Sequence, residues 1–257
     1  METLIIALAA FLASGLTLFT GFGLGTLLMP VIALFFPVEM AIGISALVHL
    51  ANNLFKLGLL GRMADLRVVL RFGLPAILAA VAGAWLLGWL AQMTPLAEYT
   101  LAGREFAVMP VKVIIGLLIL VFVVLELIPA FESLALDARY LPLGGCISGF
   151  FGGLSGNQGA FRSMFLLKVG LSKESFIATG VVLAALVDLA RVPVYAYDFM
   201  VAGREVNWIP VGMACLAAFS GAFLGARLIK KVELGTLKKI VSALLILVAL
   251  GLVSGAL

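Results

Sequence analysis

The sequence predicts an all-α polytopic membrane protein built from two inverted repeats, with about 8 to 10 membrane segments. Three observations support this prediction: an apolar composition, long stretches without charge, and two apolar stretches that are interrupted by glycine. Of the 257 residues, 64% are hydrophobic and 12% are charged. Ordinary soluble domains are roughly 45–50% apolar and about 25% charged. The composition therefore excludes a soluble enzyme, a secreted disulfide-rich module and a nucleic-acid-binding protein.

Six apolar stretches have about the 20 residues that a helix needs to cross a bilayer. These predicted spans cover residues 39–60, 68–91, 111–129, 172–192, 206–226 and 236–257. At the N-terminus, Glu2 stands where a signal peptide would carry basic residues, and the apolar run that starts at Leu4 has no cleavage site. We therefore interpret this run as the first membrane segment.

Two further apolar stretches are broken by glycine-rich segments. The first runs over 4–20, is broken at Gly21, Gly23 and Gly25, and resumes over 26–36. The second runs over 141–151, is broken over 152–159, and resumes over 160–169. An 11-residue helix is only about 17 Å long, against a hydrocarbon core of roughly 30 Å. Each stretch is therefore predicted to form two half-helices that enter the membrane and turn back.

The two broken stretches resemble each other, and each is followed by three spans. A Ser-Gly pair and a later glycine match between the halves at one shift in numbering. The matched residues are Ser14, Gly15 and Gly25 in the first half and Ser148, Gly149 and Gly159 in the second. We expect one membrane domain made of a first repeat over 1–130 and a second over 140–257. Chance similarity between glycine-rich helices is the alternative.

Basic residues gather in two connections that are not equivalent in the two halves. The first is the loop before the second span, and the second is the loop before the last span. They contain Lys56, Arg62, Arg67 and Arg71 against Asp65, and Arg227, Lys230, Lys231, Lys238 and Lys239 against Glu233. Basic loops of membrane proteins usually face the cytoplasm, and these two loops occupy different positions in the two halves. Both can be cytoplasmic only if an odd number of membrane crossings separates the halves. This requires inverted repeats with re-entrant hairpins, and it predicts that both termini lie outside.

The glycine breaks are the candidate substrate site. Backbone that is not helical at membrane depth lies where it lines a cavity or is buried in protein, and a half-helix N-terminus attracts anions. An arginine one turn into the second half-helix is costly in the membrane unless an anion or a carboxylate compensates it. The predicted substrate-binding residues are Gly21, Gly23, Gly25, Thr26, Ser155, Gly156, Asn157, Gln158, Gly159 and Arg162. The alternative is that the glycines only allow close helix packing.

Polar residues also follow one face of the helix after each hairpin, where we expect a transport path or a coupling site. In the first half they fall within about 100° of one another at 3.6 residues per turn. The predicted path residues are Ser45, His49, Asn52, Asn53 and Lys56 in the first half, and Asp188 and Arg191 in the second. Alternatives stay open, since Lys56 could be an interfacial anchor, Asp188 and Arg191 a structural pair, and His49 a packing residue.

No metal or cofactor is expected. The chain has one histidine, and its two cysteines, Cys146 and Cys215, lie far apart in apolar surroundings. This set does not supply a zinc site, and buried small apolar residues are the usual interpretation of such cysteines.

With these motifs, the chain resembles the sulfite exporter TauE/SafE family, also called the toluene sulfonate uptake permease family. The resemblance lies in the glycine-rich hairpins at 21–30 and 149–159 and in the small-residue helix after each, and it covers nearly the whole chain. Residues 153–163 and 170–174 are similar to one branch of the family. Where the family usually has further glycines and a proline in the second hairpin, this chain has Asn157, Gln158 and Met164.

The resemblance implies a secondary transporter that moves small sulfur-containing anions, such as sulfite, sulfonate, sulfoacetate or thiosulfate, across the bacterial inner membrane. We expect alternating access, with the anion at the half-helix N-termini. The expected partners are this anion, a coupling proton or sodium ion, and the lipid bilayer, with no nucleic acid and with the chain as a monomer or a homodimer. Two alternatives are a passive anion channel and a membrane-embedded hydrolase. The hydrolase would use Ser45 and His49, which lie one turn apart, although no third orienting group is evident.

The predicted topology can be tested with reporter fusions at the C-terminus. Because both basic connections are expected in the cytoplasm, a reporter that is active only outside the cytoplasm should be active there. A matched fusion in the loop at 61–65 should give the opposite result. A cytoplasmic C-terminus would contradict the inverted topology.

Overall fold

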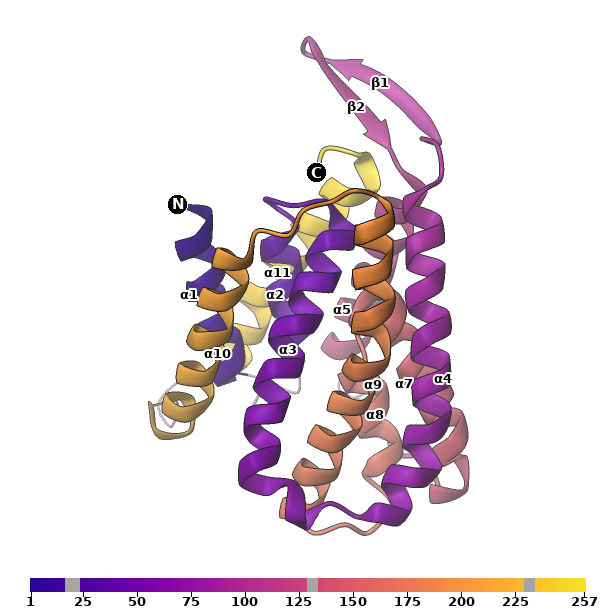
Figure 1. The fold of residues 1–257 in the computed structure, drawn as a ribbon, viewed down its shortest axis with the longest axis vertical. Helices are drawn as coiled ribbons and strands as arrows, with labels where there is room; N and C mark the ends of the chain where they lie inside the picture. The colour runs from indigo at the N-terminus through magenta and orange to yellow at the C-terminus, as the bar shows by residue number, and fades with distance from the viewer. Residues whose placement is uncertain (17–23, 129–133, 229–233) are drawn as a thin grey trace.

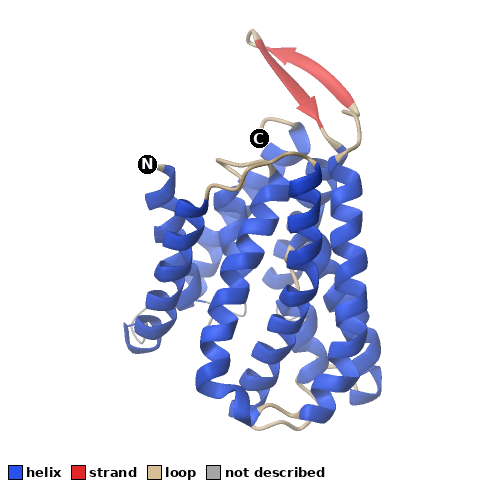
Figure 2. Ribbon diagram, viewed as in Figure 1, coloured by secondary structure: helices blue, strands red, loops and turns tan. Residues whose placement is uncertain are grey.

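The computed structural model describes residues 1–16, 24–128, 134–228 and 234–257. Within them the chain forms a bundle of helices with one small β-hairpin at one end (Figures 1 and 2). Four of the described helices are long and apolar enough to cross a membrane: α3, α4, α5 and α9. The predicted fold class, an all-α polytopic membrane protein, is confirmed.

The helices follow one order in both parts of the chain. The first part has α1 (Glu2–Leu16), α2 (Leu24–Ile32), α3 (Val38–Leu60), α4 (Leu66–Ala91) and α5 (Pro110–Leu127), with the short 3-10 helix η1 (Gly61–Met63) after α3. The second part has η2 (Ala138–Tyr140), α7 (Leu141–Ser155), α8 (Gly159–Leu166), α9 (Lys173–Val201), α10 (Trp208–Leu228) and α11 (Leu234–Ser254).

The two helical hairpins enter the bundle from opposite ends. In Figure 1, α1 runs into the bundle from the end that holds both termini, and α7 runs in from the other end. Their return helices, α2 with nine residues and α8 with eight, are too short to cross a bilayer. Every later helix of the second part runs opposite to its counterpart in the first. This is the arrangement that an inverted duplication produces, although the division into two repeats stays an inference.

Two features of the fold differ from the sequence-based expectation. The helix predicted to end at Val192 continues as α9 to Val201, with Pro193 in its interior. Proline is tolerated in membrane helices because neighbouring groups can satisfy the carbonyl that it leaves free. The connection between α4 and α5 forms the antiparallel strands β1 (Ala97–Leu101) and β2 (Arg104–Val108).

The β-hairpin turns tightly and is fastened to the end of α11. Ala102 and Gly103 both have positive φ, 51° and 77°, as the two central residues of a type I′ turn require. The Tyr99 hydroxyl donates a hydrogen bond to the Ser254 carbonyl at 2.7 Å. The hairpin therefore projects from the end that holds the termini without being free of the bundle (Figure 2).

Helices α4 and α7 pack with their backbones in direct contact. Three glycines at four-residue spacing on α7 face three α4 carbonyls, and a Cβ on any of them would lie 2.1–2.2 Å from a carbonyl oxygen. The contacts pair Gly145 with Phe72, Gly149 with Ala76, and Gly153 with Ala80. Small residues at this spacing let membrane helices approach closely. These three glycines therefore serve the close packing of α7 against α4.

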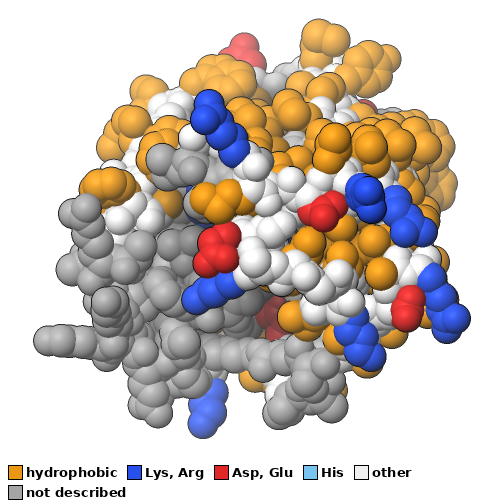
Figure 3. Space-filling model, turned by 90° about the horizontal axis from the view of Figure 1, so that it is seen from below, with side chains coloured by type: hydrophobic (Ala, Val, Ile, Leu, Met, Phe, Trp, Pro, Cys, Tyr) orange, Lys and Arg blue, Asp and Glu red, His pale blue; other side chains and the backbone are white. Residues whose placement is uncertain are grey.

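The two ends of the bundle differ in charge. We call the end with the termini and β1–β2 the hairpin end, and the opposite end, viewed in Figure 3, the basic end. Described charged residues toward the basic end are Arg62, Arg67, Arg71, Arg139, Lys168, Lys173 and Lys239, against Asp65, Glu126, Asp137 and Glu174. Those at the hairpin end are Arg104, Lys112 and Arg204, against Glu2, Glu39, Glu98, Glu105, Asp198 and Glu205. The excess of positive charge among the described residues therefore lies at the basic end.

The contact between α4 and α7 yields a stability prediction. Gly149→Val places a branched side chain against the Ala76 backbone, so we expect a loss of about 1–3 kcal/mol or more and a clearly lower Tm in detergent. Gly212→Ala on α10 is the control, because a Cβ there meets no atom within 4 Å. A wild-type Tm for Gly149→Val would contradict this packing.

Candidate functional site

The described end of the first glycine break, at Gly25 and Thr26, meets the second break in the interior of the bundle. Thr26, near the start of α2, donates a hydrogen bond from Oγ1 to Asn157 Oδ1 at 2.8 Å, and both side chains are buried. A Cβ on Gly25 would lie 3.3 Å from the Gly156 carbonyl oxygen. Two segments that are 131 positions apart in the sequence therefore touch through side chain and backbone.

The second break is held by its own side chains. Helix α7 ends at Ser155 because Gly156 has a φ of 83°, a left-handed conformation that favours glycine. The Ser148 hydroxyl donates to the Gln158 carbonyl at 2.9 Å, and Asn157 Nδ2 donates to Ser155 Oγ at 3.3 Å. Gln158 makes no side-chain capping bond to α8, which begins at Gly159. The hydrogen bonds within the break therefore position the start of α8, but the Gln158 side chain does not cap this helix.

A buried carboxylate organises the polar residues beside this break. Asp188 Oδ1 accepts from Arg191 Nη2 and Nε at 2.8 and 3.0 Å, and from Gln158 Nε2 at 3.3 Å. Its Oδ2 lies 2.6 Å from His49 Nδ1 and 3.4 Å from Asn53 Nδ2. Asp188 is 0% exposed and Arg191 is 1% exposed. One carboxylate therefore joins α9, α3 and the second break.

The side chains of α9 also satisfy carbonyls at the end of α7. Arg191 Nη1 donates to the Gly152 carbonyl, and the Tyr195 hydroxyl donates to the Gly153 carbonyl. The last carbonyls of a helix lack partners within the helix, and buried ones need other donors. Sequence reasoning missed Tyr195, although its position one turn after Arg191 on the same face was a usable signal.

Two further cations lie near the second break, and neither is in a direct ion pair among the described residues. Arg162 donates from Nη1 to Gln158 Oε1 at 3.4 Å, and Gly180 leaves space beside its guanidinium. Lys56 is half-buried, and it is close enough to Arg162 for the two positive charges to repel each other. Among the residues that the structure describes, neither forms an ion pair with a carboxylate. The single carboxylate of this cluster, Asp188, is already engaged by Arg191 and His49.

Unpartnered donors lie on the side of the first break. Ser45 and Asn52 are 2% and 1% exposed, and neither Ser45 Oγ nor Asn52 Nδ2 makes a hydrogen bond within the described part of the chain. Asn52 Oδ1 does accept from the Ser14 hydroxyl at 3.2 Å, and a Cβ on Gly25 would lie 3.8 Å from Ser45 Oγ. Since buried polar groups are rarely left unpaired, these donors are available to a ligand.

The structure thus brings together most of the predicted site residues, while their functional roles stay predictions. Gly21 and Gly23 lie outside the described residues. The hydrolase alternative needs one correction, because Asp188 does supply a third group that orients His49. The contact between nucleophile and base is nevertheless missing, since Ser45 Oγ makes no hydrogen bond to His49 among the described residues.

The cysteines and acidic residues form no metal cluster within the described residues. Both cysteines are free thiols, and Cys146 is exposed on α7 rather than buried as expected, while Cys215 is half-buried.

Comparison with known proteins gives one family. The model of the family described as sulfite exporter TauE/SafE matches residues 6–252. A search of the curated proteins found no match.

The Asp188 cluster yields a second stability prediction. Asp188→Asn leaves Arg191 buried without its carboxylate, so we expect a loss of about 3–5 kcal/mol, measured as a lower Tm in detergent. The double variant Asp188→Leu/Arg191→Met removes both charges and should recover much of that loss. Glu98→Gln, on exposed β1, is the control. If Asp188→Asn and Glu98→Gln have the same Tm, the pair does not hold the fold.

Proposed function

Because the chain belongs to the sulfite exporter TauE/SafE family, we propose that it is a secondary transporter that moves a small sulfur oxyanion by alternating access. Membership makes it a multi-pass membrane protein of a transporter family for sulfur anions. The proposal goes further, because it assigns the binding site and the mechanism to residues of this chain.

The observation that carries the proposal is the excess of positive charge where the two breaks meet. Arg191 and His49 engage Asp188, which leaves Arg162 and Lys56 without a carboxylate partner among the described residues. Uncompensated charge is costly inside a membrane protein and usually marks a functional site. A small anion beside Arg162 and Lys56 would offset both charges.

Donors on both sides of the junction suit a sulfur oxyanion. Such an anion presents several oxygens in different directions, so it can accept from the two halves at once. We assign its ligands to the Arg162 guanidinium on one side, to Ser45 and Asn52 on the other, and to the backbone at the starts of α2 and α8. Sulfite, sulfonate, sulfoacetate and thiosulfate belong to this chemical class.

The arrangement also supports alternating access. The polar links between the two parts of the chain gather at the centre, where Thr26 meets Asn157 and His49 meets Asp188. Rocking of the parts about this centre would expose the anion to either side. We assign the basic end to the cytoplasm and the membrane to the bacterial inner membrane. A proton or a sodium ion is the proposed coupling ion, and the chain would act as a monomer or a homodimer.

Binding measurements on the purified protein test the site. We expect a sulfur oxyanion to raise the Tm in a screen of sulfite, thiosulfate, sulfonates, sulfate and short carboxylates. Arg162→Ala should weaken that affinity about 10- to 100-fold, because a hydrogen bond to a charged group contributes about 1.5–3 kcal/mol. Lys56→Gln should weaken it as well. The matched control is Lys168→Gln, an exposed cation just beyond α8.

Unchanged affinity and flux of Arg162→Ala for every sulfur oxyanion would show that the site is misplaced. Flux in liposomes separates the carrier from the passive channel. A carrier should take up labelled anion faster when unlabelled anion is present on the opposite side, whereas a channel should show no such counterflow.

A further inference from the structure

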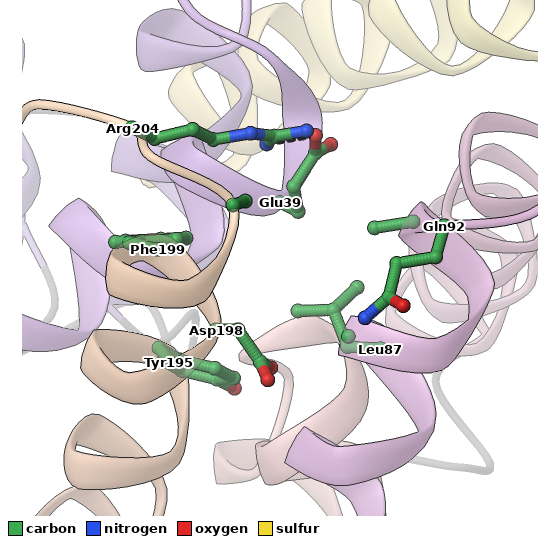
Figure 4. A pocket seen from close by; sticks show the side chains of 10 residues that line it. Glu39, Leu87, Gln92, Tyr195, Asp198, Phe199 and Arg204 are labelled. Carbon is green, nitrogen blue, oxygen red and sulfur yellow. Dashed lines mark hydrogen bonds and ion pairs between the residues drawn. The ribbon is translucent and has the colours of Figure 1, made fainter.

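A polar and aromatic face of α9 leads from the central cluster toward the hairpin end. After Arg191, this face continues with Tyr195 and then with Asp198 and Phe199, at spacings of three and four residues. Beyond the end of α9, the chain continues to Arg204. A pocket is lined on this side by Tyr195, Asp198, Phe199 and Arg204, and its opposite wall is formed by Leu87 and its neighbours on α4 (Figure 4).

Two residues of the pocket lining, Glu39 and Arg204, form an ion pair. Arg204 Nη1 donates to Glu39 Oε1, which joins the segment after α9 to the first turn of α3. The Glu39 side chain is 12% exposed and the Arg204 side chain is 31% exposed, so the pair lies at the boundary between the pocket and the surface. In Figure 4 the pair lies across the pocket from Asp198 and Leu87.

Next to the ion pair, the last turns of α9 pack tightly between α3 and α4. A Cβ on Gly43 of α3 would lie 2.6 Å from the Phe199 ring, and a Cβ on Gly88 of α4 would lie 2.1 Å from Asp198 Oδ2. Phe199 is buried and Asp198 faces the pocket. The Phe199 ring therefore lies tightly against Gly43, where α9 meets α3.

The equivalent contact at the basic end is weaker. There, the segment after α3 meets the first part of α9, and the Asp65 N–H donates to Thr179 Oγ1 at 2.9 Å. Within the described residues, no ion pair joins these two segments. The ion pair therefore distinguishes the hairpin end from the basic end.

We propose that Glu39, Arg204 and Phe199 form a gate that closes the hairpin end, and that the structure holds this gate shut. The inference rests on the proposed transport function, because a gate needs a path. Opening requires the ion pair to break and Phe199 to leave Gly43. A partly exposed ion pair is of modest strength, which suits a contact that must break in every cycle.

Thiol labelling tests the gate without using any substrate. Leu87 is 1% exposed and lies in the pocket wall, so Leu87→Cys, in a background with Cys146→Ser and Cys215→Ala, reports opening. In liposomes whose hairpin end faces outward, a membrane-impermeant maleimide should label it slowly. Glu39→Gln and Arg204→Gln should each raise the labelling rate about tenfold, as expected when a sparsely populated open state gains population. The swapped variant Glu39→Arg/Arg204→Glu should restore slow labelling.

Two controls accompany this measurement. Thr100→Cys, on the exposed hairpin, should label at one rate in every background, and Glu105→Gln should leave the Leu87→Cys rate unchanged. Equal Leu87→Cys rates with and without the ion pair, at an unchanged Tm, would overturn the gate. Because labelling needs no anion, this failure is distinguishable from a failure of the transport proposal.

Cross-linking provides a second test, in which the two positions are held together covalently. A short bifunctional thiol reagent should join Glu39→Cys to Arg204→Cys and abolish anion flux, and a cleavable reagent should restore flux on reduction. Full flux in the cross-linked protein would overturn the proposal.

Discussion

The pairing of Asp188 with Arg191 is the interaction on which the centre of this protein depends. Both side chains are almost fully buried, and the carboxylate also contacts His49, Asn53 and Gln158. Because Arg191 also reaches the Gly152 carbonyl, the pair connects α9 to the end of α7 and to α3. A buried charge that loses its partner is strongly destabilising, so the helix positions and the charges constrain one another.

Close helix packing makes this cluster possible. The backbone contact between α4 and α7 positions α7, and the carbonyls near the end of α7 are the ones that Arg191 and Tyr195 bind. Glycines therefore have two distinct roles in the second hairpin. Gly149 and its neighbours on the same face permit the approach of α4, whereas Gly156 permits the turn that brings Asn157 to Thr26.

The sequence predicts the parts of this arrangement that depend on composition and on helical spacing. Long apolar stretches predict the spans, and the three-residue spacing of Asp188 and Arg191 predicts their shared face. It does not predict that His49 meets Asp188, because that contact joins helices 139 positions apart. The β-hairpin was missed because its signal is only a short alternation around Ala102 and Gly103 within a membrane chain. The last turns of α9 were not predicted because a proline such as Pro193 usually ends or bends a helix in a soluble protein. In a packed membrane bundle, neighbouring groups allow the helix to continue.

Helix α9 carries both the central cluster and the proposed gate. Asp188 and Arg191 lie beside Gln158, which contacts Arg162 in the proposed anion site, and Phe199 lies two turns farther along the same helix. Both places belong to one helix, so a displacement of α9 as a whole moves both. An anion that draws Arg162 away from Gln158 would therefore alter the contacts that hold α9. One of those contacts is the packing of Phe199 against Gly43. Such a mechanical link needs no separate pathway of residues, because a single helix with two alternative positions is enough to couple binding to opening.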